Sequence, residues 1–461
     1  MILLQSLFLS CKYTARRLFY ACIAGMRVSL KRLDKIFRLC FWAAIVFLVF
    51  LAGAFSAHFD WALNDLIRDA KEAGTAFHKK EKDIKKAEAR ERKNKIQFQE
   101  REVLKKKGAY EGFARYSSKA IGAALVYMDG KMVHQWYNPF SKIWTNAPQV
   151  DRPMPDSQIL WRDAYLYPNG DLLVVHEGVG DTPYGYGLAK LDKDSNVLWH
   201  FDENAHHRMD VGPDGKLYVL TQSMVKTDPK SKRGFLPSEV LEDFLVILTP
   251  DGKTLEKISL VDAFLGTPYE PLLKKRHRGK SFDVLHTNSV NVLTPETAKA
   301  FPQFKAGQVL LSFHTPSAIA VLDLDSRSIV WLAQGSWKLQ HDAEFVDDGT
   351  IMMFDNQGAG NKMSRILKYD PADQSVKVAY QGNDEHPFYI VVRGMQQLLP
   401  NNNILITEAG KGRVFEVTPE QKIVWEFINP HQVRNKPLLI VIAKRYKRED
   451  VPFLNDEPDQ E

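Results

Sequence analysis

The stretch FVDDGTIMMFDN, residues 345–356, reads as a strand, a tight Asp-Gly turn and a second strand. Its apolar and β-branched residues on either side of Asp348-Gly349 predict a β-hairpin. Close variants of the same phrase recur, with the third copy split by a longer turn: DAYLYPNGDLLVV (163–175), MDVGPDGKLYVL (209–220), SVNVLTPE with AGQVLLSF (289–296 and 306–313) and MQQLLPNNNILIT (395–407). The chain therefore repeats one supersecondary unit.

A second hairpin type alternates with the first and often ends on an aromatic residue. Its six copies are VYMDGKMVHQWY (126–137), LDKDSNVLWHF (191–201), LTPDGKTLEKI (248–258), LDLDSRSIVWLA (322–333), YDPADQSVKVAY (369–380) and VTPEQKIVWEF (417–427). Two alternating hairpins make a four-stranded unit, and radial repetition of such units protects sheet edges in a β-propeller. The pattern predicts an all-β, six-bladed β-propeller over residues 118–446, with inserts 223–243 and 264–285 as loops; a pair of stacked sandwiches is the alternative.

The N-terminal region has a different character. Residues 39–57 (LCFWAAIVFLVFLAGAFSA) are uncharged and about as long as the roughly 20 residues that cross a bilayer, so they predict a transmembrane helix. The whole chain has a net charge of +6. Residues 1–58 carry +7 of charge, so the remaining residues together carry −1. The positive-inside rule then places the basic segment 1–38 in the cytoplasm and the propeller on the periplasmic or outer side of the inner membrane. The alternative is a signal peptide cleaved near Ala57.

Composition narrows the remaining choices. A chain of 461 residues with 44% hydrophobic and 26% charged residues can bury a large core. All three cysteines lie within the first 40 residues, so the propeller contains no disulfide and no cysteine zinc site. The excess positive charge is confined to the N-terminal region, which argues against a nucleic-acid partner. Residues 58–117 predict a helical stalk or linker without sustained heptads, and residues 447–461 predict an acidic flexible tail.

The hairpins also predict a site. Equivalent residues lie upstream of the five turns of the first type: Arg162, His207, His286, His341 and Arg393. The residues after the second strands should join them: His176, Gln222, His314, Asn356 and Glu408. Because equivalent hairpins place equivalent residues around one axis, we expect one cationic, histidine-rich and acid-poor pocket. Such a pocket suits an anionic substrate and an imidazole nucleophile or proton carrier. No G-x-S-x-G motif and no P-loop is present in the sequence.

Four segments resemble the bacterial arylsulfotransferase family: LHTNSVNVL (285–293), LLSFHTPSAIAVLDL (310–324), LQHDAEFVDDGTIMMFDN (339–356) and GRVFEVTPEQKIVWEF (412–427). The resemblance covers roughly residues 120–445. It implies transfer of a sulfuryl group from an aryl sulfate donor to a phenolic or other hydroxyl acceptor, without the nucleotide donor PAPS and without a cofactor. The bilayer is the other expected partner, and a homodimer is left open by the sequence.

The resemblance also implies roles for individual residues. The family's transient sulfohistidine falls on His341, and its companion histidines and asparagine fall on His207, His286 and Asn288. The family's pocket arginine is replaced by His314, which carries a positive charge only when protonated.

In the expected mechanism, His341 attacks sulfur and a phenol then removes the group. His286 or His207 transfers the proton, and Asn288, Arg162 and Arg393 steady the sulfuryl oxygens. The neighbouring Asp342 and Glu344 either orient His341 or are ordinary turn and strand-end residues.

Two other functional classes are compatible with this sequence. One is a non-catalytic, membrane-tethered binding propeller, which the replacement at His314 favours. The other is a metal-dependent enzyme that resembles the iron-dependent carotenoid oxygenases, which have four histidines on seven blades. Six repeats here argue against that class, and no metal site is predicted.

Overall fold

The computed structural model describes residues 41–48, 80–89, 95–118, 121–274, 282–360 and 363–456. The chain divides into two compact units, Met1–Lys82 and Asp83–Glu461. The predicted cytoplasmic segment 1–38 lies outside the described residues. Of the predicted membrane span 39–57, residues 41–48 are described, and they are helical. None of the helices in the described part of the chain has the length and apolar character needed to span a membrane.

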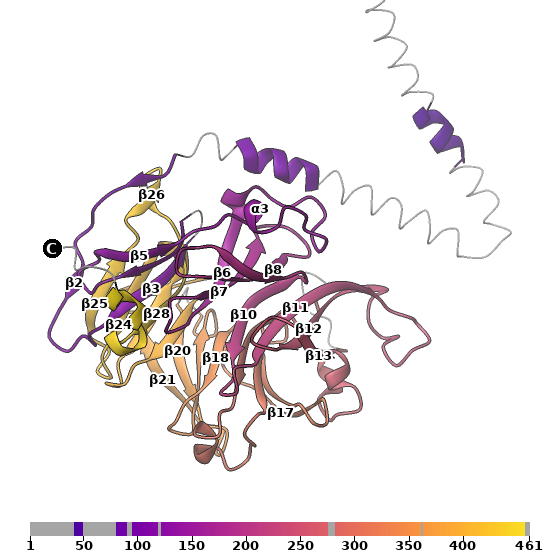
Figure 1. The fold of residues 1–461 in the computed structure, drawn as a ribbon. Coiled ribbons are helices and arrows are strands. Elements are labelled where there is room, and N and C mark those ends of the chain that lie inside the picture. The colour runs from indigo at the N-terminus through magenta and orange to yellow at the C-terminus, as the bar shows by residue number, and fades with distance from the viewer. Residues whose placement is uncertain are drawn as a thin grey trace, which may run out of the picture. The chain divides into compact units, whose positions relative to one another are not determined.

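The prediction of an all-β fold is confirmed, and the described residues form six antiparallel sheets of four or five strands (Figure 1). The first sheet contains β28 (Ile440–Tyr446), β3 (Phe113–Ser118), β4 (Gly122–Val126) and β5 (Met132–Trp136). The second contains β6 (Ile159–Leu166), β7 (Leu172–Gly178), β8 (Gly185–Leu191) and β9 (Val197–Phe201). The third contains β10 (Ala205–Val211), β11 (Leu217–Lys226), β12 (Glu239–Leu248) and β13 (Thr254–Ser259).

The other three sheets repeat this order. The fourth contains β14 (Thr287–Val292), β15 (Val309–Phe313), β16 (Ala318–Asp323) and β17 (Ser328–Gln334). The fifth contains β18 (His341–Phe345), β19 (Ile351–Asp355), β20 (Arg365–Tyr369) and β21 (Val376–Gln381). The sixth contains β22 (Met395–Leu398), β23 (Ile404–Glu408), β24 (Arg413–Val417), β25 (Ile423–Ile428) and, at its edge, β2 (Leu104–Lys105).

Smaller elements decorate these sheets. A three-stranded sheet contains β1 (Gln97–Phe98), β26 (His431–Val433) and β27 (Lys436–Pro437). The helical elements of this unit include α3 (Phe140–Ile143) and the 3₁₀ turns η1 (Asp156–Gln158), η2 (Asp262–Phe264), η3 (Glu270–Leu272), η4 (Thr297–Ala300), η5 (Ala409–Lys411), η6 (Arg448–Asp450) and η7 (Pro452–Asp456). Residues 80–89 are also helical.

The structure differs from the predicted stalk, insert and tail. Residues 80–89 are helical, but the rest of the described stalk contains β1, β2 and the start of β3, because pairing with β26, β25 and β28 outweighs helix propensity. The insert at 223–243 partly extends the hairpin of β11 and β12. The tail forms η6 and η7 and buries Val451 and Phe453, and only residues 457–461 lie outside the described part.

The first strands of the sheets contact one another in a cyclic order: β28, β6, β10, β14, β18, β22 and again β28. At each junction between two consecutive sheets, a side chain of one sheet hydrogen-bonds to the backbone of the first strand of the next sheet. Five of them accept a backbone N–H: Asp163 from Met209, Asp210 from Val292, Asn291 from Phe345, Asp342 from Gln396, and Gln397 from Arg445. At the sixth junction, Ser117 Oγ donates to the Trp161 carbonyl. These bonds satisfy backbone groups that the edge strands leave unpaired.

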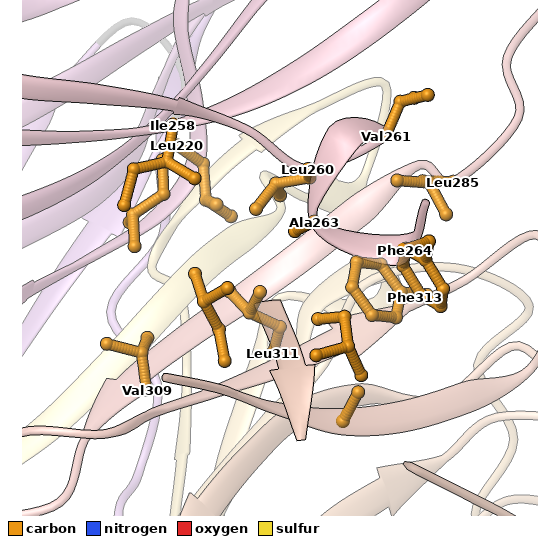
Figure 2. Close-up of a cluster of buried hydrophobic side chains, with 14 of the residues drawn as sticks. Leu220, Ile258, Leu260, Val261, Ala263, Phe264, Leu285, Val309, Leu311 and Phe313 are labelled. Carbon is orange, nitrogen blue, oxygen red and sulfur yellow. The ribbon is translucent and has the colours of Figure 1, made fainter. Parts of the chain in front are cut away.

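Apolar residues fill the spaces between consecutive sheets. Figure 2 shows one such cluster, in which Leu220 and Ile258 of the third sheet meet Leu311 and Phe313 of the fourth. The aromatic residues that end the second hairpin type have a matching role. Trp136 Nε1 donates to the Gly170 carbonyl in the next sheet's turn, and Trp425 Nε1 donates to the Met128 carbonyl. The repeated aromatic residue therefore fixes one sheet against its neighbour.

Candidate functional site

Four imidazole rings lie together where the first strands begin. His207 is on β10, His286 directly precedes β14, His314 directly follows β15, and His341 begins β18. Ring centroids are 5.1 Å apart for His207 and His286, 4.8 Å for His286 and His314, 5.5 Å for His314 and His341, and 6.5 Å for His341 and His207. We call these four residues the histidine cluster.

Two members of the cluster are buried and two reach its surface. His207 and His341 are buried, whereas His286 and His314 are partly exposed. We call the partly exposed pair, His286 and His314, the rim of the cluster and the buried pair, His207 and His341, its floor.

The hydrogen bonds of His341 fix its tautomer. Nδ1 lies 2.8 Å from Asn356 Oδ1 and 3.1 Å from the Leu339 carbonyl. Asn356 Nδ2 donates to the carbonyls of Ile390 and Arg393, which assigns the amide orientation. Because both partners of Nδ1 only accept, Nδ1 carries the proton and Nε2 presents its lone pair. The Arg393 backbone N–H donates to this lone pair at 3.3 Å, so Nε2 must give up that hydrogen bond before it can attack.

The surroundings of His341 keep the ring neutral. Burial, followed by repulsion from His314 and Arg162, holds its pKa well below the usual value. Only the neutral imidazole has a lone pair for attack. The position of His341 thus combines a fixed tautomer, a neutral ring and an unprotonated Nε2 held by the Arg393 backbone N–H.

His286 has the opposite tendency. Its Nδ1 lies 2.6 Å from Asp283 Oδ2. Burial lowers the pKa of His286, but the hydrogen bond and the attraction to Asp283 outweigh burial and raise it above the usual value. A histidine held by a carboxylate on one nitrogen can deliver a proton from the other nitrogen. His286 is therefore the proton donor that the geometry favours.

His207 lies in a different set of contacts. Its Nδ1 is 2.9 Å from His206 Nδ1 and 3.5 Å from Glu177 Oε1. Burial, together with repulsion from Arg162, holds the pKa of His207 well below its usual value. His207 is therefore neutral and already engaged, which makes it a poorer proton donor than His286.

Arginine and glutamate lie beside the cluster. Arg162 Nε is 3.2 Å from Glu177 Oε2 in a buried ion pair. The Arg393 guanidinium has no ion-pair or hydrogen-bond partner among the residues that the structure describes, and burial followed by repulsion from Arg162 lowers its pKa. Glu177 and Asp283 show that the expectation of an acid-poor pocket was wrong, because Arg162 pairs with Glu177 and His286 pairs with Asp283.

Two predicted binding residues differ from expectation. Asn288 Nδ2 donates to the Gln340 carbonyl at 2.7 Å, so the amide holds the backbone that precedes His341. Burial and repulsion from His286 lower the pKa of His314 to about 4. His314 is therefore neutral near pH 7 and does not supply the positive charge of the arginine that it replaces.

Of the residues expected after the second strands, Asn356 contacts His341 and Gln222 lies beside Tyr184 and Gly185. The structure places His176 and Glu408 away from the histidine cluster. His176 is fully buried against the rings of Phe140, Trp144 and Trp161, and burial lowers its pKa to about 3. β7 continues to Gly178, so alternation directs Glu177 rather than His176 toward the cluster. Glu408 instead pairs with Arg413 and Lys411.

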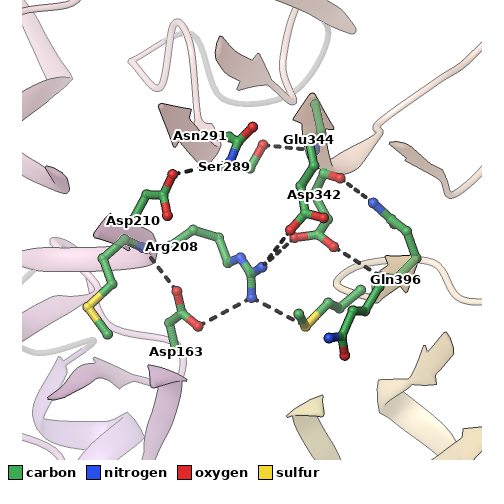
Figure 3. Close-up of polar contacts among 12 residues, drawn as sticks. Asp163, Arg208, Asp210, Ser289, Asn291, Asp342, Glu344 and Gln396 are labelled. Atoms are coloured by element: carbon green, nitrogen blue, oxygen red, sulfur yellow. Dashed lines mark hydrogen bonds and ion pairs between the residues drawn. The ribbon is translucent and has the colours of Figure 1, made fainter. Parts of the chain in front are cut away.

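Asp342 and Glu344 do not orient His341. Asp342 Oδ1 lies 2.6 Å from Arg208, and Glu344 lies 3.7 Å from it (Figure 3). Arg208 also meets Asp163 at 3.2 Å. We call Arg208, Asp163, Asp342, Glu344 and Asp210 the Arg208 cluster.

Several site residues were missed from the sequence. His206 directly precedes His207, and the His-His pair was a usable signal. Asp283 lies three residues before His286. The ring of Tyr184, in the loop before β8, lies edge-on to His206 and His207 at 5.4 Å, and its hydroxyl makes a long 3.5 Å contact with His286 Nδ1. No periodic feature of the sequence marks Tyr184.

A four-histidine metal centre does not fit the geometry. Among the described residues, one group of at least three potential ligand atoms lies within 4.8 Å, and it consists of Glu177, His206 and His207. The other three members of the histidine cluster are not part of it. The resemblance to four-histidine oxygenases therefore has no counterpart in the arrangement of these rings.

Comparisons with known proteins support the residue-level resemblance. A model of the family described as arylsulfotransferase (ASST) matches residues 164–430, which is more than half of the chain. All predicted site residues except Arg162 fall in this range. No curated protein matches the chain.

Similar solved structures share little sequence. One is a protein of unknown function from Bacteroides caccae, at 12% identity over 72% of this chain and 98% of that chain, with a TM-score of 0.45. Another is virginiamycin B lyase from Staphylococcus aureus, at 11% identity over 73% and 88%, with a TM-score of 0.36. By the match over residues 164–430, the chain belongs to the arylsulfotransferase (ASST) family.

Proposed function

We propose that this chain is an aryl-sulfate sulfotransferase that works through a sulfohistidine at His341, at one end of a six-bladed propeller. The propeller is supported by six sheets whose first strands contact in a cyclic order. The observation that carries the mechanism is the hydrogen bonding of His341, which leaves Nε2 unprotonated, with its lone pair accepting the Arg393 backbone N–H in the resting site. Family membership supports a sulfotransferase, and the individual steps are our proposal.

In the first half-reaction, His341 Nε2 attacks the sulfur of an aryl sulfate. The N–S bond forms, the bond between sulfur and the aryl oxygen breaks, and its electron pair leaves on that oxygen. His286, held by Asp283, gives this oxygen a proton. The sulfated ring carries a positive charge, which Asn356 Oδ1 and the Leu339 carbonyl stabilise through Nδ1–H.

In the second half-reaction, a hydroxyl acceptor enters the same place. Neutral His286 removes its proton, the acceptor oxygen attacks sulfur, and the N–S bond breaks with its electron pair returning to Nε2. One site therefore serves both donor and acceptor, which predicts ping-pong kinetics.

Arg393 supplies the fixed positive charge that His314 lacks. Its guanidinium has no partner among the described residues, whereas Arg162 is paired with Glu177. Its backbone N–H donates to the attacking nitrogen at 3.3 Å in the resting site, and this donor is released to a sulfuryl oxygen once Nε2 bonds to sulfur. We assign Arg393 to oxygen binding, and His314 to the rim through which the aryl group passes.

We further propose that residues 39–57 anchor the chain in the inner membrane, with the propeller on the periplasmic or outer side. The support is the uncharged stretch and the basic segment before it. Alkaline phosphatase fused to the C-terminus should be active in cells, because this reporter matures outside the cytoplasm. A fusion that is active only with a cytoplasmic reporter would contradict this orientation.

The transfer reaction is tested with the full-length chain, 4-nitrophenyl sulfate as donor and phenol as acceptor. His341→Ala should lose activity by at least about 10³-fold, because no other nitrogen holds the same position. His386→Ala, which removes an exposed histidine outside the cluster, is the matched control and should retain activity. Equal activity in both variants would reject His341 as the nucleophile.

A further inference from the structure

Beside the histidine cluster, three potential ligand atoms converge in the interior. The nitrogens come from His206 and His207 on β10, and the oxygen comes from Glu177 on β7. All three residues are buried, and their donor atoms lie within 4.8 Å of one another. The proposed transfer reaction uses neither His206 nor Glu177 directly, so this arrangement needs its own explanation.

The distances suit a shared metal ion. His206 Nδ1 and His207 Nδ1 are 2.9 Å apart, and His207 Nδ1 is 3.5 Å from Glu177 Oε1. Ligand atoms that each lie about 2.0–2.2 Å from one ion stand about 3 Å apart. Two imidazole nitrogens facing each other across 2.9 Å share at most one proton, so at least one lone pair is directed at the other ring. A cation between them would use both lone pairs.

The second side of His206 adds an independent observation. Its Nε2 is fully buried without a hydrogen-bond partner, and it faces Asp243 Oδ1, which also lacks one, at 3.5 Å. Histidines that bind a metal through one nitrogen commonly present the other to a carboxylate, which fixes the ring and raises its basicity. Asp243 is itself held by the Thr287 backbone N–H and hydroxyl.

We propose that Glu177, His206 and His207 bind one divalent first-row transition-metal ion, such as Zn²⁺ or Fe²⁺. Two imidazoles and one carboxylate are a donor set for both ions and leave further coordination positions open. Arg162 pairs with the other oxygen of Glu177, Oε2. Oε1 accepts one hydrogen bond from the His207 backbone N–H and keeps a second lone pair for the ion. The inference does not depend on sulfuryl transfer.

The test measures metal directly. The full-length chain, freed of affinity tag, is stripped with a chelator, incubated with Zn²⁺ or with Fe²⁺ under anaerobic conditions, desalted and analysed by inductively coupled plasma mass spectrometry. We expect about one ion per chain of the preferred metal. His206→Gln and Glu177→Gln should each reduce bound metal at least tenfold, and Asp243→Asn should weaken affinity about 10–100-fold.

His314→Gln is the matched control, because it removes a neighbouring imidazole that is not a ligand. It should bind metal as the unaltered chain does. Circular dichroism of each variant separates loss of a ligand from loss of the fold, and having two ligand variants keeps the test decisive if one fails to fold. Less than about 0.1 ion per unaltered chain, or equal binding by the ligand variants and the control, would overturn the proposal. Neither result depends on turnover, so failure here is distinct from failure of the sulfotransferase proposal.

Discussion

The histidine cluster and the Arg208 cluster share two strands, β10 and β18, but differ in how their charges are paired. On β10, His207 belongs to one cluster and Arg208 to the other, and on β18 His341 and Asp342 divide in the same way. Both strands have a register shift at this point, and His207 and Asp342 have positive φ angles of 51° and 54°. Adjacent residues are thereby sent to different clusters.

Pairing distinguishes the two clusters. Arg208 lies within ion-pairing distance of Asp163, Asp342 and Glu344. In and beside the histidine cluster, His206 Nε2, Asn288 Oδ1 and Asp283 Oδ1 are buried without hydrogen-bond partners. In the Arg208 cluster, Asp342 Oδ1 also lacks one by the same criterion, but it lies 2.6 Å from the Arg208 guanidinium. Unsatisfied buried polar atoms reduce stability, and they are often found at functional sites. We therefore propose that the Arg208 cluster supports the fold and that the histidine cluster supports the chemistry.

The largest expected effect is a loss of catalytic rate with little change in stability. His286→Gln should lower kcat about 10²–10⁴-fold because it removes the proton donor, with little change in unfolding free energy. Asp283→Asn should move the alkaline limb of the pH–rate profile to lower pH, because Asp283 is what raises the pKa of His286 and the acid must be protonated to act. An unshifted limb in the asparagine variant would show that another group is the acid.

The next effect tests whether the Arg208 cluster stabilises the fold. Arg208→Met should destabilise the fold by about 3–5 kcal/mol, since it leaves buried carboxylates without their cation. Arg393→Met, at a guanidinium with no described partner, should change stability by less than about 1 kcal/mol and lower kcat/KM about 100-fold. Urea unfolding and initial rates measure both. Similar unfolding midpoints for the two variants would remove the distinction drawn here.

His314 and Glu344, one residue from each cluster, should contribute to pH-dependent stability with opposite signs. His314 has a folded pKa of about 4, so the stability from keeping it neutral is present above about pH 6.5 and is lost as pH falls toward 4. Burial and repulsion from Asp342 raise the pKa of Glu344 to about 8, so its contribution is present at low pH and is lost as pH rises toward 8.

His314→Asn should therefore flatten the acid side of the stability profile, and Glu344→Gln the alkaline side, each by up to about 1.4 kcal/mol per pH unit. Unfolding curves between pH 4 and 8 measure these slopes. The test depends on the signs of the two changes in slope more than on their sizes. A steeper alkaline side of the stability profile in Glu344→Gln would contradict the protonated state assigned to Glu344.

The smallest effect concerns the residue that departs from the family. His314→Arg should raise kcat/KM by a few-fold, because an arginine adds a second fixed charge beside Arg393. His314→Gln, which adds no charge, serves as its control. A loss of activity in the arginine variant would indicate that the rim requires a neutral side chain.

The repeated hairpins allowed much of the fold and part of the site to be predicted. Turn residues and alternation set the strands, and equivalent hairpins brought His207, His286 and His341 together, as the ring distances show. The contacts that depend on strand length and bulges were not predictable. β7 continues past His176 to Gly178, so Glu177 replaced His176, and the bulge on β18 carried Asp342 away from His341. Tyr184 lies in a loop whose path only tertiary packing determines.

The central claim is that His341 becomes covalently sulfated, and peptide mass spectrometry under single-turnover conditions tests it most directly. The full-length chain is mixed with 4-nitrophenyl sulfate without acceptor, quenched at neutral or alkaline pH and digested. The account predicts that the peptide containing His341 gains the mass of one sulfuryl group and loses it when phenol is added before quenching. An unmodified His341 peptide accompanied by a stoichiometric burst of nitrophenol, or a label on another residue, would contradict it.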